Sequence, residues 1–325
     1  MMRPDVSVVM SVYNGEDTLP MTMDSILAQD GVNLEVVVIN DGSTDGSQRI
    51  LDDYSQTDPR VQVFHQENQG LTRALQDGIL RARGDLIARH DVGDRSYPHR
   101  LMTQAEYLRT HPHVVAVGCG HRRVGPSGEV LGETMGEMDP ERVSRRFLDG
   151  GSALLHAATV FRKQAYEQSG GYRPQFLFAQ DHDLWYRLSD LGKLSEVSEI
   201  LCEIEINLTG ISAANRFTQT ELARLARVAH ETRLRGESDE SILRQAQRVS
   251  DDHRERKKCA AASQTQVRAA AYLIGSQLLA NRDARCRGYL IQAALTPRLF
   301  SKAIAKYLQS FIVCSPKTSS DQYAK

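Results

Sequence analysis

The stretch Gly84-Asp85-Leu86-Ile87-Ala88-Arg89-His90-Asp91-Val92-Gly93-Asp94 decides the fold, because a short apolar run leads directly into an acidic turn. The apolar run at residues 86–88 predicts a buried strand. Asp91 and Asp94 follow on a glycine-containing turn, and carboxylates at the exit of a buried strand cost desolvation energy unless a cation lies beside them. A divalent cation that holds a phosphate is one answer. A turn with two solvated aspartates is the other.

Upstream of this stretch, strand patterns alternate with helix patterns. Residues 6–13 are β-branched and almost wholly apolar, which is typical of a strand buried on both faces of a parallel sheet. Residues 34–39 and 61–64 repeat the strand pattern, and apolar residues at helical spacing follow each strand. This alternation predicts βαβ units and a mostly parallel sheet.

Small polar side chains follow three of the predicted strands. These segments are Ser11-Val12-Tyr13-Asn14, Asn40-Asp41-Gly42-Ser43 and Asp91-Val92-Gly93-Asp94. Ligands of open α/β sheets bind beyond the carboxyl ends of the strands, so we expect one binding site at this edge. Neither GxGxxG after the first strand nor GxxxxGK[ST] anywhere is present, which excludes the dinucleotide and P-loop fingerprints. A bound nucleotide would therefore be held by acids and a metal.

Composition limits the classes of function. The 325 residues carry a net charge of -1, so no overall basic field predicts nucleic-acid binding. The five cysteines are scattered and lack CxxC spacing, which favours reduced thiols in the cytoplasm over a zinc site or a disulfide framework. The first residues do not form a signal-peptide pattern, and no apolar run approaches the roughly 20 residues that cross a bilayer.

Five motifs occur in order along the chain. They are Val8-Val9-Met10-Ser11-Val12-Tyr13-Asn14-Gly15, Val38-Ile39-Asn40-Asp41-Gly42-Ser43-Thr44-Asp45, Asn68-Gln69-Gly70-Leu71-Thr72-Arg73-Ala74-Leu75, Ala82-Arg83-Gly84-Asp85-Leu86-Ile87-Ala88-Arg89, and Gly170-Gly171-Tyr172 with Gln180-Asp181-His182-Asp183-Leu184-Trp185-Tyr186-Arg187-Leu188. With these motifs, residues 5–210 resemble an inverting glycosyltransferase of family 2. The resemblance implies an α/β fold of the glycosyltransferase A type, a single Rossmann-like nucleotide-sugar transferase domain with a mostly parallel mixed sheet.

The resemblance also implies which residues bind the donor, a nucleoside diphosphate-sugar that is expected to be UDP-linked. Tyr13 would stack on a uracil-like base and Asp41 would accept from its ring N–H, while Arg73 would contact the diphosphate or brace Asp91. A packed aromatic and a surface cation are the alternatives for Tyr13 and Arg73. The expected nucleotide-sugar contacts are Ser11, Tyr13, Asn14, Asp41, Gly70, Arg73 and Asp91.

The acidic motif departs from the family pattern. The family reads Asp-Ala-Asp-Asp where this chain reads Asp91-Val92-Gly93-Asp94, so Gly93 replaces a carboxylate that reaches the metal. The resemblance implies Mn²⁺ or Mg²⁺ at Asp91, with Asp94 as a substitute ligand. Asn207 stands where the family often has a histidine-containing turn. These departures leave open whether the metal is required.

A second chemical centre lies at residues 180–185. The resemblance implies that Asp181 is the general base, because one carboxylate near the acceptor hydroxyl takes its proton. Gln180 replaces the glutamate of the family, and Asp183 is a candidate helix cap. Trp185 is expected in the core or in an acceptor wall. His156 is either a contact for phosphate or acceptor, or a buried structural histidine.

Strand patterns end before residue 216. We therefore predict a catalytic domain at residues 1–215 and a helical C-terminal region at residues 216–325. An apolar stripe at residues 298–313, with Lys302 and Lys306 off it, either packs onto this region or contacts a membrane surface. The chain would then act in the cytoplasm, with a peripheral contact at the inner face of the membrane.

These residues favour transfer of a sugar to a hydroxyl acceptor with inversion. The acceptor would be a glycan, a lipid-linked sugar or a protein, in the synthesis of a polysaccharide, a surface glycan or a glycolipid. Two alternatives stay open. Gly93, Gln180 and Asn207 suit a nucleotide-sugar-binding protein with weak or no catalysis. A nucleotidyltransferase on a related sheet is the other, although Asn14-Gly15-Glu16-Asp17 lacks its basic glycine-rich loop.

Overall fold

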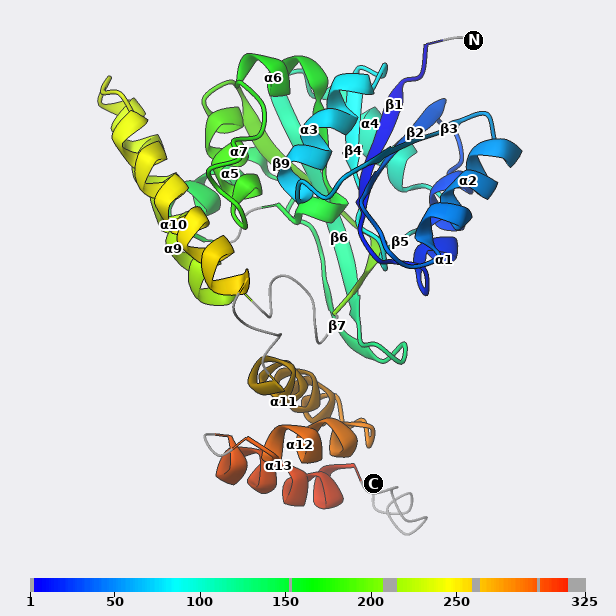
Figure 1. Cartoon of the computed structure of the whole chain (residues 1–325), viewed down its shortest axis with the longest axis vertical. Coiled ribbons are helices and arrows are strands. Elements are labelled where there is room, and N and C mark those ends of the chain that lie inside the picture. The colour runs from blue at the N-terminus through cyan, green and yellow to red at the C-terminus, as the bar shows by residue number, and fades with distance from the viewer. Residues whose placement is uncertain (1–2, 152–153, 207–214, 259–263, 297–298, 315–325) are drawn as a thin grey trace, which may run out of the picture. The chain divides into compact units, whose positions relative to one another are not determined.

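A mixed β-sheet is the main feature of the larger of two compact units in the computed structural model (Figure 1). The structure describes residues 3–151, 154–206, 215–258, 264–296 and 299–314. Within these ranges nine strands join one sheet in the order β3-β2-β1-β4-β8-β6-β9-β5, and β7 pairs with β6. The strands are β1 (Val6–Val12), β2 (Leu34–Asp41), β3 (Val61–Gln66), β4 (Leu86–Arg89), β5 (Arg95–Ser96), β6 (Val114–Val124), β7 (Val130–Thr134), β8 (Val160–Arg162) and β9 (Lys193–Glu205).

The first half of the sheet is parallel, as the sequence predicts. β1 pairs in parallel with β2 and β4, and β2 pairs in parallel with β3. The register aligns Val9 with Val37 on one side and with Arg89 on the other. The connecting helices are α1 (Leu19–Leu27), α2 (Ser47–Thr57) and α3 (Leu71–Arg81). The predicted βαβ units are therefore confirmed.

The second half of the sheet is antiparallel, which makes the sheet mixed. β8 lies antiparallel to both β4 and β6, and β5 lies antiparallel to β9. The helices of this half are α4 (Arg100–Thr110), α5 (Pro140–Leu148), the short 3₁₀ turn η1 (His156–Ala158), α6 (Lys163–Gln168) and α7 (Gln180–Ser189).

Apolar layers cover both faces of the sheet. Val9 and Val37 belong to a buried cluster with Leu75 of α3, whereas Val8 belongs to a second cluster with Leu19 of α1. Successive residues of a strand point to opposite faces, so a strand buried on both faces has a continuous apolar sequence. This explains why residues 6–10 are apolar except for Ser7, which is itself fully buried.

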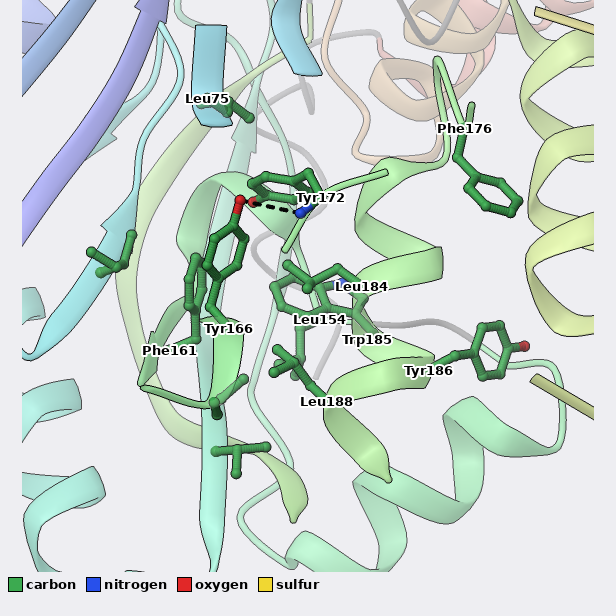
Figure 2. Close-up of a cluster of buried hydrophobic side chains, with 14 of the residues drawn as sticks. Leu75, Leu154, Phe161, Tyr166, Tyr172, Phe176, Leu184, Trp185, Tyr186 and Leu188 are labelled. Atoms are coloured by element: carbon green, nitrogen blue, oxygen red, sulfur yellow. Dashed lines mark hydrogen bonds between the residues drawn. The ribbon is translucent and has the colours of Figure 1, made fainter. Parts of the chain in front are cut away.

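An aromatic group packs where the antiparallel half meets α7 (Figure 2). Trp185 is fully buried there, and its ring meets Phe161 edge-on at a centroid distance of 6.2 Å. Tyr172 donates its backbone N–H to the hydroxyl of Tyr166 at 3.1 Å (Figure 2). The core interpretation of Trp185 is confirmed.

The chain divides into two compact units. The first contains residues 1–122, 133–204 and 217–255, and the second contains residues 123–132, 205–216 and 256–325. The helical region predicted for residues 216–325 is therefore divided between them. Its first helices are α9 (Arg216–Leu234) and α10 (Glu240–Lys258). Leu222 of α9 and Ala246 of α10 are fully buried in the cluster that contains Trp185, which places these helices in the sheet unit.

The second unit has its own small core. Its helices are α11 (Gln264–Ala280), α12 (Cys286–Ala294) and α13 (Phe300–Val313). Leu131 of β7 packs with Leu278 of α11 and Leu290 of α12. Asn281 donates its side-chain N–H to the carbonyls of Val130 and Leu131, each at 3.1 Å. In the part of the chain that the structure describes, no helix is long and apolar enough to span a membrane.

Candidate active site

The carboxyl ends of β1, β2 and β4 lie at one edge of the sheet. The register aligns Ser11 with Ile39 and Val12 with Asn40, so Tyr13 and Asp41 follow at the same level. Asp91 follows Arg89, whose partner in β1 is Val9. Parallel strands in this register bring Ser11, Tyr13, Asp41 and Asp91 to one edge, as the sequence predicts.

Asp41 holds the loop that precedes α3. The residue is 2% exposed, and its Oδ1 accepts from Gln66 Nε2 and from the backbone N–H of Gln69, each at 2.8 Å. Its Oδ2 accepts from the backbone N–H of Gly70 at 2.8 Å. A carboxylate has about four lone-pair sites, so capacity for a ligand N–H remains. The contacts nevertheless show that Asp41 also has a structural task, which the sequence did not indicate.

The loops after β1 and β2 are tied to each other. Asn14 adopts a φ of 52°, a left-handed conformation that asparagine tolerates better than most residues. Its Oδ1 accepts from the backbone N–H of Thr44 at 2.8 Å, and its own N–H donates to Ser43 Oγ at 3.0 Å. Tyr13, next to this junction, is 56% exposed. The packed-aromatic alternative for Tyr13 is therefore wrong, and its ring is accessible to a ligand.

Gly70 and Arg73 lie at the start of α3. Gly70 is the N-cap with φ 87° and ψ 157°, and a Cβ placed there would meet no atom within 4 Å. Glycine is required at this position by the left-handed φ, and not by a steric clash of a Cβ with neighbouring atoms. Arg73 is exposed in the first turn. Backbone N–H groups at a helix start favour anions, so this segment offers suitable chemistry for a phosphate.

Asp91 is bound by an arginine that the sequence analysis did not single out. Arg89 is 1% exposed, and its Nη2 donates to Asp91 Oδ1 while its Nη1 donates to the carbonyl of His90. The side chain of Asp91 is 44% exposed. Arg89 Nε is buried without a hydrogen-bond partner among the described atoms. A cation inside an otherwise apolar strand was the signal for this pair, since a buried charge requires a partner.

The two carboxylates of the turn at residues 91–94 differ in their exposure to solvent. Gly93 adopts a φ of +96°, which disfavours any residue with a Cβ, and its N–H donates to Thr22 Oγ1 at 3.0 Å. Thr22 Oγ1 in turn donates to the carbonyl of Asp94 at 3.1 Å. Asp94 is only 5% exposed. Asp91 is therefore the accessible carboxylate of this turn.

The donor set is a modest fit for a divalent cation. Within the described ranges, no three His, Cys, Asp or Glu side chains form a group that could hold a metal ion. Magnesium nevertheless uses one or two protein carboxylates, and waters and substrate phosphates complete its coordination. One accessible carboxylate, Asp91, meets that minimum. The altered Asn207 lies outside the described residues.

The buried phenol of Tyr172 lies near both Asp181 and Asp91. Burial raises the pKa of Tyr172 well above its usual value, the Arg89 guanidinium opposes this, and the carboxylates of Asp181 and Asp91 both add to the increase. The two carboxylates therefore lie within electrostatic range of Tyr172, although they are 90 positions apart in the chain. Tyr172 binds His156 through its hydroxyl, which lies 2.6 Å from Nε2.

His156 is partly buried beside Tyr172. Burial is the main cause that holds its pKa well below the usual value, and the nearby Arg89 and His182 act in the same direction. A neutral imidazole that is hydrogen-bonded to Tyr172 fits the structural alternative for this residue.

Asp181 occupies the first turn of α7. Its Oδ1 accepts from the backbone N–H of His182 at 2.9 Å. The expected cap at Asp183 is wrong, because α7 begins at Gln180 and Ala179 is the N-cap. Asp183 is fully buried and pairs with Arg187 at 2.5 Å. Asp183 is therefore structural, whereas Asp181, two residues earlier, is only partly buried.

The profile of glycosyl transferase family 2 matches residues 7–170. EpsE of Bacillus subtilis (strain 168), which carries the name of a glycosyltransferase, is 34% identical over 193 residues, which are 58% of this chain and 68% of that protein.

Two solved structures share the fold. S. aureus TarS 1-349, in a crystal structure with UDP, is 16% identical, with a TM-score of 0.55 over 95% of this chain and 90% of that one. The mannosyltransferase PcManGT from Pyrobaculum calidifontis, in complex with GDP-Man and Mn²⁺, is 18% identical, with a TM-score of 0.51 over 96% and 87%. At these identities the likeness shows the fold alone.

Proposed function

The chain belongs to glycosyl transferase family 2, and from this premise we propose that it transfers a sugar from a nucleoside diphosphate donor to a hydroxyl acceptor with inversion. The proposed site is the sheet edge formed by the ends of β1, β2 and β4 together with the first turn of α7. The nucleotide would occupy the side of β1 and β2, and the acceptor would approach from the side of α7.

The exposed aromatic ring and the loop contacts support the donor half. Tyr13 is 56% exposed and would stack on the base, while Asp41 would accept from a base N–H. Ser11 and Asn14 would line this side, and the start of α3, with Gly70 and Arg73, would face the diphosphate. UDP is our preferred donor nucleotide, and the UDP complex of TarS lends support from a protein of the same fold.

We assign Asp91 as the carboxylate that would hold Mn²⁺ or Mg²⁺, with Asp94 as a second candidate. The exposure of Asp91 supports the assignment, and the Mn²⁺ complex of PcManGT supports it by fold. When bound, such a cation neutralises the charge of a leaving diphosphate. Arg89 keeps one oxygen of Asp91 in a fixed direction.

Asp181 would be the general base in a single displacement. The acceptor oxygen forms a bond to the anomeric carbon while the bond from that carbon to the diphosphate oxygen breaks. The acceptor proton passes to Asp181, and the nucleoside diphosphate leaves with the electron pair. One displacement inverts the anomeric configuration and needs no nucleophilic side chain. The observation that carries this proposal is that the parallel register brings the ends of β1, β2 and β4 to one edge of the sheet, where Asp91 exposes its carboxylate.

The test is a transfer assay with a panel of nucleotide sugars and hydroxyl acceptors. We expect Asp181→Asn to lower kcat by about 10²–10⁴-fold, the usual contribution of a general base, with the Kd for UDP unchanged. Asp85→Asn is the matched control, because Asp85 is an exposed carboxylate paired with Arg3, and it should retain full activity.

Three results of this assay would contradict the proposal. Full activity of Asp181→Asn would remove the assigned base. Binding of UDP by the unaltered protein without transfer from any donor would favour a nucleotide-sugar-binding protein, as Gly93 and Gln180 suggest. Release of pyrophosphate from a nucleoside triphosphate would favour a nucleotidyltransferase.

The acceptor and its setting are proposed from the same resemblance. We propose an acceptor hydroxyl on a glycan, a lipid-linked sugar or a protein, in the synthesis of a polysaccharide, a surface glycan or a glycolipid. The proposed place of action is the cytoplasm, at the inner face of a membrane that residues 298–313 contact. No nucleic acid takes part.

A further inference from the structure

Helix α13 packs Ala303, Tyr307 and Val313 against the core of the second unit but leaves three large apolar side chains exposed. Ala303 and Ser310 are fully buried. Phe300, Leu308 and Phe311 are 55%, 61% and 47% exposed. An ordinary surface helix directs its large apolar residues toward the core, so three exposed ones on one helix are unusual. The outward face of α13, which we define by Phe300, Leu308 and Phe311, is therefore a candidate contact surface.

The neighbouring helices of the second unit also expose large apolar side chains. Ile291 of α12 and Leu295, the C-cap of that helix, are 49% and 62% exposed at a spacing of four residues. Leu273 of α11 is 60% exposed. Single exposed apolar residues are ordinary, but six large ones within about fifty residues make the second unit a candidate interaction surface.

Positive charge is concentrated in the same part of the chain. Residues 256–325 contain twelve of the 40 lysines and arginines but only two of the 41 acidic residues. The net charge of this segment is therefore +10, although that of the whole chain is -1. Lys302 and Lys306 lie on α13 itself, and the guanidinium of Arg287 lies 4.2 Å from the ring centroid of Phe311.

We propose that the second unit docks on the surface of an anionic bilayer through the outward face of α13. An amphipathic helix with lysines beside its apolar face lies in the plane of the membrane interface. The 14 residues of α13 are too few to cross the hydrocarbon core. Lysines and arginines close to an anionic leaflet are attracted to it.

The charge argues for a bilayer over a second copy of the chain. Two units of the same net charge repel each other when their cationic faces meet. An anionic bilayer supplies both a negative surface and an apolar interior, which match Lys302 and Lys306 on one side of the helix and Leu308 on the other. Docking would hold the chain at a surface that carries lipid-linked acceptors, and only this consequence rests on the proposed function.

The experiment is vesicle flotation of the full chain without donor or acceptor. Vesicles of zwitterionic lipid alone are compared with vesicles that also contain anionic phospholipid, at low and high salt. We expect the protein to float with the anionic vesicles and to be released by salt. Because flotation involves no transfer chemistry, its failure is distinguishable from failure of the transferase proposal.

Two double variants test the two halves of the surface. Lys302→Gln with Lys306→Gln should weaken partitioning about fivefold for each charge, so about 25-fold together. Phe300→Gln with Leu308→Gln should abolish flotation at the same lipid concentration. Phe217→Gln with Leu234→Gln removes two comparable apolar side chains from α9, which are 84% and 70% exposed, and should leave flotation unchanged. Circular dichroism confirms that each variant is folded.

Other outcomes would overturn the proposal. Flotation that does not depend on anionic lipid would remove the role of the charge. Absence of flotation, with a dimer in analytical ultracentrifugation that Phe300→Gln with Leu308→Gln dissociates, would assign the face to a second copy. Absence of flotation with a monomer would show that α13 has no membrane role.

Discussion

Arg89 is the residue that links the fold to the proposed chemistry. Its guanidinium is almost fully buried in β4, yet it donates to a carboxylate that is 44% exposed. The pair therefore has one desolvated partner and one hydrated partner. This arrangement restricts the direction of the Asp91 side chain at the end of β4. In the 91–94 turn, Asp91 is the only accessible carboxylate.

Replacement of Arg89 tests this positioning role. Arg89→Met removes the buried charge and leaves Asp91 in water, so we expect the free energy of unfolding to change by no more than about 1–2 kcal/mol. We expect kcat/KM for transfer to fall by roughly 10²-fold, because a misplaced contact of about 1 Å can cost that much. Urea unfolding and steady-state transfer measure the two quantities. Unchanged kcat/KM with unchanged stability would contradict the role.

At the residue scale, strand ends were predictable and side-chain partners were not. Tyr13, Asp41 and Asp91 follow apolar runs, so their place at the sheet edge follows from the topology of parallel strands. The partner of Asp91 could not be predicted, because it depends on how Arg89 is directed inside the sheet. Asp183 was expected to cap a helix but is buried against Arg187, since the helix begins earlier than its apolar pattern indicates.

At the scale of elements, the connection between β3 and α3 depends on β2. The carboxylate of Asp41 at the end of β2 accepts from the backbone N–H groups of Gln69 and Gly70. Gly42 allows this approach, because a Cβ there would lie 2.7 Å from the backbone nitrogen of Asn68. Hydrogen bonds to the end of β2 thus hold the loop that carries Gly70 and leads to Arg73.

Asp41→Asn tests this loop. The amide has one acceptor oxygen in place of two, so at least one buried N–H loses its partner, and we expect a loss of about 1–3 kcal/mol in the free energy of unfolding. UDP binding should weaken as well, since the start of α3 loses its support. Asp52→Asn is the control, because Asp52 is half exposed beside His65 and should change stability by under about 1 kcal/mol. Equal effects of the two changes would contradict this account.

The elements themselves were largely predictable. Strands of continuous apolar residues and helices with apolar spacing are found at the expected places from β1 to β4. α9 buries Leu222, Leu225 and Ala226, which recur at helical spacing in the sequence. The pattern does not tell which core a helical face joins. From the sequence, the helices after residue 215 are therefore predicted as one region. In the structure α9 and α10 belong to the sheet unit, and α11–α13 belong to the second unit.

At the scale of the whole molecule, the two units differ in charge as well as in architecture. The segment 256–325 carries a net charge of +10, so the remaining residues carry -11. The total of -1 conceals this separation, which is why composition alone gave no indication of a charged surface. The cationic helices and the acidic transferase unit are therefore suited to different partners.

Hydrogen exchange with and without UDP tests most directly whether the proposed residues form one donor site. We predict slower exchange on UDP binding at the ends of β1 and β2, in the loop before α3 and in the 91–94 turn, with α11–α13 unchanged. Protection that is confined to another part of the chain, or that misses both Tyr13 and Asp91, would contradict the assignment of this edge of the sheet.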